Sequence, residues 1–257
     1  MTEPTRRVPR AMLQAALNGD RDHPATPRTP AAIAAEAAAA VSAGAQVLHL
    51  HPFDDDGRQT LAAEPCARTI AAVRRACPGV PISLSTSADI EPDPARRLAL
   101  LQSWTVLPEL VIANQGEDGI GDLCRVAVGR GIGVEAGLLS VADSEVFVAS
   151  GLASLCTRVL VEPLDNDPEQ AVADAETMEG LLADAGVTLP QVHHGDHLAS
   201  WAVNARGAAG GHGIRTGLED TPVLPDGTTA RGNGDLLAAA ALILRAHDDA
   251  LEDGATA

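Results

Sequence analysis

The sequence predicts a single-domain (β/α)8 TIM barrel, because short β-like runs alternate eight times with longer alanine-rich helical runs in 257 residues. The composition agrees with this fold. Hydrophobic residues make up 46% of the chain and aromatic residues only 2%, so the core consists mainly of Ala, Val, Leu and Ile. A doubly wound sheet is the alternative, but no glycine-rich dinucleotide turn follows an early strand.

Each predicted strand is a short apolar run that precedes a predicted helix. Three helices have clear start signals, because a capping residue precedes a proline at Thr29, Asp93 and Asp167. The predicted strands span 11–17, 46–51, 81–85, 110–114, 132–135, 158–162, 191–194 and 213–217. The predicted helices span 30–43, 64–76, 94–102, 119–129, 140–149, 168–185, 198–208 and 234–247.

No linker or low-complexity tract interrupts this alternation. We therefore expect one catalytic barrel over residues 8–250, with loose ends at 1–7 and 251–257.

The formal charge of −17 disfavours binding to nucleic acids and to anionic membranes, because a field of this sign repels phosphate groups. The N-terminus lacks the apolar stretch of a signal peptide, and the longest apolar run, 236–244, is too short to span a bilayer. The four cysteines show no C-x-x-C spacing and indicate buried thiols in a reducing compartment. The sequence thus predicts a soluble cytoplasmic protein.

In a barrel of this type the active site lies at the C-terminal ends of the strands. Polar residues at these ends are therefore the candidates for chemistry. They are Asn18, His49, His51, Ser85, Thr86, Asn114, Glu135, Glu162, the group from His193 to His197, Arg215, Glu219 and Asp220.

The strongest pattern among these is His49-Leu-His51, because side chains two apart on a strand face the same side. Both imidazoles then point into the barrel mouth, where they either bind one metal ion or form buried hydrogen bonds. Glu219 follows the last strand, which in a closed barrel is one strand removed from the second. Two imidazoles and a carboxylate suit Zn²⁺, while Fe²⁺, Mn²⁺ and Co²⁺ fit the same ligand types.

A rival cluster is the segment from His193 to His197, in which His193 and His194 face opposite sides of a strand. We expect it to support the substrate or the metal ligands, or to cap a helix through Asp196, and it is the alternative metal site. His23, His212 and His247 have no partner pattern and are interpreted as surface or packing residues.

At these residues the chain resembles the β-keto acid cleavage enzyme family, whose founding activity is 3-keto-5-aminohexanoate cleavage. The resemblance implies a (β/α)8 barrel, assembled as a homotetramer, with Zn²⁺ bound by His49, His51 and Glu219. It also implies an exchange in which a β-keto acid and acetyl-CoA become acetoacetate and a new acyl-CoA. The matching motifs are Ala16-Leu-Asn-Gly19, His23-Pro24, Gly44-Ala45 before His49-Leu-His51, Asp56-Gly-Arg58, Ser85-Thr86, Pro108-Glu109 with Asn114, and Gly211-His-Gly-Ile-Arg-Thr-Gly-Leu-Glu-Asp220.

The resemblance further implies roles for the other strand-end residues. Asp220 would be the catalytic base, Arg215 would bind a carboxylate or position Asp220, and Ser85 would hydrogen-bond the substrate. Asn114 and Thr86 would contribute to substrate binding. Arg231 is a candidate contact for a CoA phosphate.

The chain departs from the family pattern in two places. Relatives carry a glutamate soon after the first strand, where residues 20–23 offer no match, and Ile112 replaces a Ser or Thr before Asn114. Two alternative hypotheses stay open: a metal-dependent aldolase or hydrolase that does not use CoA, and a catalytically silent metal-binding barrel.

Overall fold

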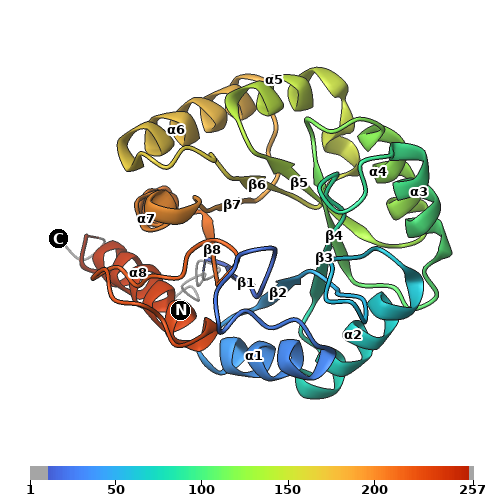
Figure 1. The fold of residues 1–257 in the computed structure, drawn as a ribbon. Coiled ribbons are helices and arrows are strands. Elements are labelled where there is room, and N and C mark those ends of the chain that lie inside the picture. The colour runs from blue at the N-terminus through green and yellow to red at the C-terminus, as the bar shows by residue number, and fades with distance from the viewer. Residues whose placement is uncertain (1–10, 255–257) are drawn as a thin grey trace, which may run out of the picture.

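The computed structural model describes residues 11–254, and its eight parallel strands close into a barrel (Figure 1). Each strand pairs with the next one along the chain, and β8 pairs with β1 to close the ring. The strands are β1 (Leu13–Ala16), β2 (Val47–Leu50), β3 (Ile82–Ser85), β4 (Leu110–Asn114), β5 (Gly133–Leu138), β6 (Arg158–Val161), β7 (Gln191–His193) and β8 (Gly213–Thr216).

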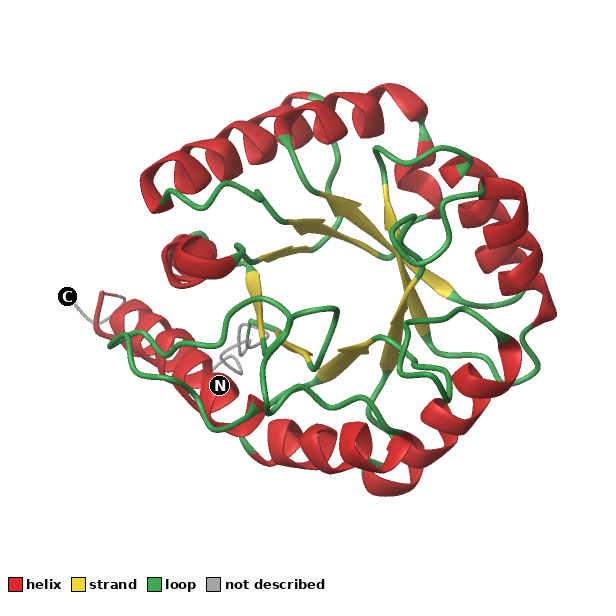
Figure 2. Ribbon diagram, viewed as in Figure 1, coloured by secondary structure: helices red, strands yellow, loops and turns green. Residues whose placement is uncertain are grey.

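Eight α-helices surround the barrel (Figure 2), and each follows one strand, so the predicted fold class is confirmed. Two short 3-10 helices, η1 (Leu152–Leu155) and η2 (His197–Ala199), lie in the connections. The α-helices are α1 (Pro30–Ser42), α2 (Ala63–Ala76), α3 (Pro94–Ser103), α4 (Ile120–Gly129), α5 (Val141–Ser150), α6 (Pro168–Asp184), α7 (Ser200–Ala209) and α8 (Asn233–Gly254).

The three predicted helix starts are confirmed by their hydrogen bonds. The Thr29 hydroxyl accepts from the backbone N–H of Ala32, and the carboxylates of Asp93 and Asp167 each accept from two backbone N–H groups of the first turn. These bonds satisfy donors that have no partner inside the helix, and the following proline already has the helical φ angle. The turns that end the strands are therefore followed by sharply defined helices.

Two element ends differ from the prediction by three residues or more, and the others lie within two residues of it. Strand β5 continues to Leu138, three residues past its predicted end. Gly137 pairs with Asn114 of β4 and lies against its side chain, where a larger residue would not fit. A glycine inside a strand commonly marks such a close approach. Helix α8 extends to Gly254, so residues 251–254 are helical where a loose end was expected. Residues 1–10 and 255–257 lie outside the described part of the chain.

The core has two layers. Apolar side chains fill the space between the strands and the surrounding helices, while a smaller cluster of Ile112, Leu160 and Val192 lies inside the barrel. The side chain of Glu135 is also fully buried. It accepts hydrogen bonds from Gln14 and Ser83 and pairs with Arg158 at 2.6 Å.

The expectation that Glu135 belongs to the active site is therefore not supported by its position. It is the third residue of a six-residue strand, and it does not line the pocket described below. Because β5 ends at Leu138, the strand-end position belongs to Leu139, which does line the pocket. Glu135 instead forms a buried ion pair in the core.

We expect Arg158→Met to destabilise the fold by about 3–5 kcal/mol, because it leaves the Glu135 carboxylate buried without its cation. Urea unfolding followed by circular dichroism measures this loss. The double variant Glu135→Gln with Arg158→Met serves as the control and should recover part of the lost stability. Equal stabilities of the single variant and the unmodified protein would contradict a role for this pair.

Candidate active site

A pocket of about 340 Å³ opens at the C-terminal ends of the strands. This is the end at which barrels of this type carry their chemistry. Nine of the residues predicted from the sequence line its wall: His49, His51, Ser85, Asn114, Glu162, Asp196, His197, Arg215 and Glu219.

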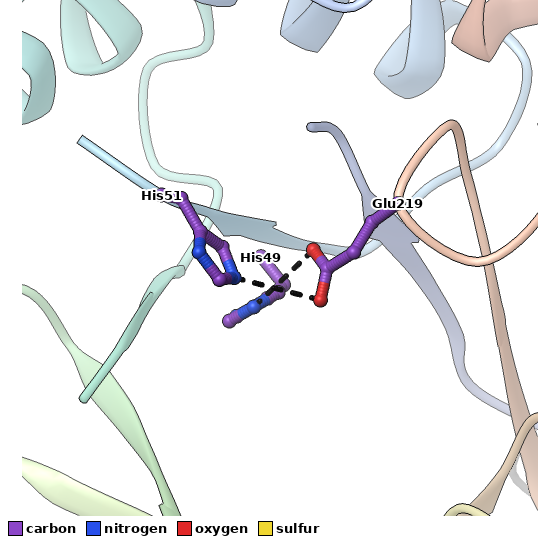
Figure 3. A group of neighbouring side chains, drawn as sticks. All are labelled: His49, His51 and Glu219. Atoms are coloured by element: carbon purple, nitrogen blue, oxygen red, sulfur yellow. Dashed lines mark ion pairs between the residues drawn. The ribbon is translucent and has the colours of Figure 1, made fainter. Parts of the chain in front are cut away.

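The side chains of His49, His51 and Glu219 converge in this pocket (Figure 3). His49 Nε2 lies 3.5 Å from Glu219 Oε2, and His51 Nε2 lies 3.5 Å from Glu219 Oε1. The two imidazoles come from β2 and from the residue that follows it, whereas the carboxylate comes from the loop after β8. The sequence prediction that these three side chains meet agrees with the structure.

The arrangement fits a divalent cation. A tetrahedral zinc site with bonds of about 2.1 Å places its ligand atoms roughly 3.4 Å apart, close to the separations seen here. Glu219 Oε2 is buried and has no hydrogen-bond partner among the described residues. Two neutral nitrogen ligands and one carboxylate form a donor set that zinc and several other divalent transition metals accept.

Neighbouring residues hold the two histidines in place. His51 Nδ1 donates to Gln59 Oε1 at 2.5 Å, which leaves the lone pair of Nε2 facing Glu219. The Asn18 side chain bridges the loop after β1 to the end of β2, since its Oδ1 accepts from the His51 N–H at 2.8 Å and its Nδ2 donates to the His51 carbonyl at 2.9 Å. Asn18 thus fixes the backbone of a metal-ligand candidate.

The carboxylate of Glu219 lies directly over Gly19. A Cβ atom on Gly19 would come within 2.7 Å of Glu219 Cγ, and the backbone there has a φ of +76°. Both observations require glycine at this position. The Asn233 side chain accepts from the Leu218 N–H and donates to the Leu17 carbonyl, so it ties the loop after β8 to the end of β1.

Arg215 connects the metal-ligand candidates to the other acidic residues. Its Nη2 lies 2.6 Å from Glu219 Oε1 and 2.8 Å from Asp220 Oδ1, and its side chain is only 2% exposed. Glu162 Oε1 lies 3.9 Å from the same nitrogen. The guanidinium of Arg215 therefore lies within 4 Å of three carboxylates.

These contacts determine the protonation states. Burial alone would raise the pKa of Glu219, but Arg215 and the two histidines hold it well below its usual range. For Asp220, burial is likewise outweighed by Arg215 and His194, and its pKa is lowered. Burial lowers the pKa of His49, which favours the neutral, metal-binding imidazole. For His51 burial also acts to lower the pKa, but Glu219 and Gln59 outweigh it and raise the pKa above its usual value.

A second group of titratable side chains lies behind Arg215. His194 is fully buried, with Nε2 3.3 Å from Glu162 Oε2 and Nδ1 3.7 Å from Asp220 Oδ1. Asp220 is 2% exposed and does not line the pocket, whereas Glu162 does. Because the guanidinium of Arg215 already contacts both carboxylates, we do not assign a cation to this group.

His193 points to the outside of the barrel, as the alternation along β7 predicts. Its ring stacks on that of His212 with centroids 4.5 Å apart, and Glu179 Oε1 lies 2.9 Å from His212 Nε2. Arg206 binds the other Glu179 oxygen at 2.5 Å. The group formed by Glu179, His193 and His212 therefore already contains a cation, the Arg206 guanidinium. The structure therefore divides the rival histidine cluster between two environments, and His212 is a packing residue.

The remaining predicted substrate residues occupy different positions. Ser85 lines the pocket, and Asn114 does so while donating to Glu117 Oε1 at 2.9 Å. Thr86 is 1% exposed, and its hydroxyl donates to the Ile112 carbonyl at 2.5 Å rather than facing the pocket. The side chain of Ile112 adds an apolar surface to the wall.

The loop after β1 supplies a residue that sequence reasoning missed. Arg21 binds Asp196 at 2.6 Å and donates to the backbone carbonyls of Glu219 and Asp220, so it connects the loops after β1, β7 and β8. Asp196 takes part in this ion pair and makes no side-chain cap hydrogen bond, contrary to the capping interpretation. No spacing rule identifies such a contact across loops.

Arg231, the candidate phosphate contact, is occupied by a carboxylate. Its Nε and Nη2 each lie 2.8 Å from an oxygen of Asp235, and it does not line the pocket. The four cysteines are all free thiols. Within residues 11–254, none of the helices combines the length and the apolar character that crossing a bilayer requires.

A closed parallel barrel with acidic, basic and candidate metal-ligand side chains gathered at its C-terminal end is the architecture of a TIM-barrel enzyme. The chain belongs to the beta-keto acid cleavage enzyme family, whose sequence model matches residues 10–127 and 165–257. His49 and His51 lie in the first matched segment, and Arg215, Glu219 and Asp220 lie in the second.

A relative in the same family supports this membership, and two solved structures share the fold. A 3-keto-5-aminohexanoate cleavage enzyme of Fusobacterium nucleatum subsp. nucleatum is 28% identical over 238 residues, which cover 84% of this chain and 82% of the relative. Among solved structures, ObcA superposes with a TM-score of 0.70 at 18% identity over 90% of this chain, which spans 65% of the ObcA chain. 3-Hexulose-6-phosphate synthase gives a TM-score of 0.51 at 16% identity, covering 92% of this chain and 99% of that one. These structures share the barrel fold.

We expect Gly19→Ala to weaken Zn²⁺ binding about 10–100-fold, because the new methyl group displaces Glu219. Titration against a chromophoric chelator measures the affinity. Gly57→Ala is the matched control, since Gly57 has the same φ of +76° but nothing within 4 Å of an added Cβ. If both variants bind Zn²⁺ as tightly as the unmodified protein, Gly19 does not position the carboxylate.

Proposed function

We propose that this protein is a Zn²⁺-dependent acyltransferase that converts a β-keto acid and acetyl-CoA into acetoacetate and a new acyl-CoA. The observation that carries the proposal is the convergence of His49, His51 and Glu219 beside the Arg215–Asp220 pair. Family membership supplies the class of substrate. ObcA, which shares the fold, has been crystallised with oxaloacetate, a β-keto acid, and with a C4-CoA adduct, which supports a keto acid and CoA as ligands here.

His49, His51 and Glu219 would hold the cation. When bound, it would polarise the keto oxygen and stabilise the negative charge that develops as the neighbouring carbon loses its proton. Arg215 keeps the Asp220 carboxylate ionised, so Asp220 is the acceptor of that proton from C2 of the keto acid. Asp220 lies behind Arg215, and a movement of this pair is needed to bring the carboxylate to C2.

The remaining bond changes follow from the carbanion chemistry. The C2 carbanion attacks the thioester carbon of acetyl-CoA and displaces the CoA thiolate. This thiolate adds to the original keto carbon, C3, and the C2–C3 bond then breaks to give acyl-CoA and the carbanion of acetoacetate. Ser85 and Asn114, on the wall of the pocket, would hydrogen-bond the keto acid, and the placement of Thr86 suggests that it supports the backbone of Ile112.

The first experiment combines metal analysis with an activity assay. Purified protein is incubated with acetyl-CoA and a panel of β-keto acids, and acetoacetate is measured. Acetoacetate formation that depends on acetyl-CoA supports the proposal. Turnover that is indifferent to acetyl-CoA would indicate an aldolase or hydrolase, and bound metal without turnover would indicate a silent barrel.

We expect Asp220→Asn to retain Zn²⁺ while turnover falls about 10²–10⁴-fold, because the side chain keeps its shape and loses its capacity to accept a proton. Metal content by mass spectrometry and acetoacetate formation check both parts. Asp122→Asn, on the exposed surface of α4, is the matched control. A nearly normal rate for Asp220→Asn would remove this residue from the mechanism.

The homotetramer and the cytoplasmic location belong to the same proposal. Free cysteine thiols are consistent with a reducing compartment. Light scattering of the purified protein measures the number of subunits.

A further inference from the structure

Glu162 is a carboxyl group on the pocket wall that the proposed reaction does not use. It follows β6 directly, and its side chain is 16% exposed and faces the pocket. The residue lies between the two segments that the family model matches, so the family resemblance assigns it no role.

The surroundings of Glu162 are partly apolar. Leu139 and Leu164 line the same pocket, and the Glu162 backbone N–H bonds to the carbonyl of Leu138 at the end of β5. Its carboxylate lies 3.3 Å from His194 Nε2 and 3.9 Å from Arg215 Nη2. His194 Nε2 has no hydrogen-bond partner among the described residues. The carboxyl of Glu162 is therefore partly buried and only weakly bound.

Asp220, in contrast to Glu162, is bound closely by a cation. Arg215 donates to both of its oxygens, at 2.8 Å from Nη2 and at 3.4 Å from Nε. Burial raises the pKa of Glu162 above its usual value. A pocket carboxyl group without a close cationic partner is suited to donate a proton, whereas a carboxylate that a guanidinium binds through both oxygens is suited to accept one.

The positions of the two groups agree with this division. Glu162 and Glu219 contact the same Arg215 nitrogen, so the Glu162 carboxyl lies next to the metal-ligand candidates and opens into the cavity. Asp220 contacts this nitrogen too but lies behind it, away from the wall. Glu162 is thus the carboxyl group with the more direct access to a bound keto acid.

We propose that Glu162 is a catalytic residue that donates a proton to C2 of acetoacetate after the C2–C3 bond breaks. The O–H bond of Glu162 breaks as the new C2–H bond forms, and the electron pair of the carbanion becomes that C–H bond. Water entering the pocket restores the proton on Glu162, while Asp220 releases to water the proton taken from the substrate. This inference rests on the proposed function.

The test separates the two proton transfers. Without acetyl-CoA the reaction stops after C2 is deprotonated, so in D2O the enzyme exchanges the C2 hydrogen for deuterium through Asp220 alone, which NMR detects. Turnover with acetyl-CoA requires both groups. For Glu162→Gln we expect Zn²⁺ content to be unchanged, exchange to stay within about threefold of the unmodified enzyme, and turnover to fall about 10²–10⁴-fold.

Glu179→Gln is the matched control, because it removes a carboxylate outside the barrel and should leave exchange and turnover unchanged. Normal turnover in Glu162→Gln would overturn the assignment. Loss of both exchange and turnover with Zn²⁺ retained would also overturn it, since Glu162 would then act in proton removal. Failure of the proposed function is distinguishable, because the unmodified enzyme would then form no acetoacetate from acetyl-CoA.

A second variant covers the case in which Glu162→Gln does not fold. Glu162→Ala leaves space for a small acid, and added formate should restore turnover in a concentration-dependent manner. A purely structural defect would not respond to formate, so absence of rescue in the folded Ala variant would overturn the donor role.

Discussion

The candidate active site depends on the placement of one largely buried carboxylate, that of Glu219. It is a potential metal ligand opposite two histidines from the other end of the chain, and it is also bound by Arg215. A buried charge is tolerated only when partners compensate for its lost hydration. The loop after β8 is accordingly held by the contact between Gly19 and Glu219 and by the hydrogen bond from the Leu218 N–H to Asn233. The pairing of β8 with β1 brings these residues together.

The charge balance of the pocket favours a cation. Glu219 and Asp220 both contact the single guanidinium of Arg215, and both histidines carry no charge when their nitrogens are available as ligands. Carboxylates therefore exceed fixed positive charges in a region of low dielectric constant. A divalent ion held by His49, His51 and Glu219 would offset this excess, which is a physical reason for a metal that does not depend on likeness to relatives.

The barrel and its central site were predictable from the sequence because both follow from local periodicity. Alternation of strands and helices defined the fold, and the two-residue spacing of His49 and His51 predicted their common direction. The partners Gln59 and Arg21 were not predictable, because they reach the site from loops whose paths depend on tertiary contacts. Glu135 was placed in the site because its strand was expected to end at residue 135, and Thr86 because its hydroxyl was expected to face the pocket instead of a neighbouring carbonyl.

The buried layer formed by Glu135, Arg158, Ile112, Leu160 and Val192 closes the barrel below the pocket. The cavity is consequently closed at the end that lies inside the barrel. Molecules that bind there enter and leave at the C-terminal end of the strands, and none of them crosses the barrel. The loops after the strands, rather than a channel through the fold, therefore control access to the candidate metal ligands.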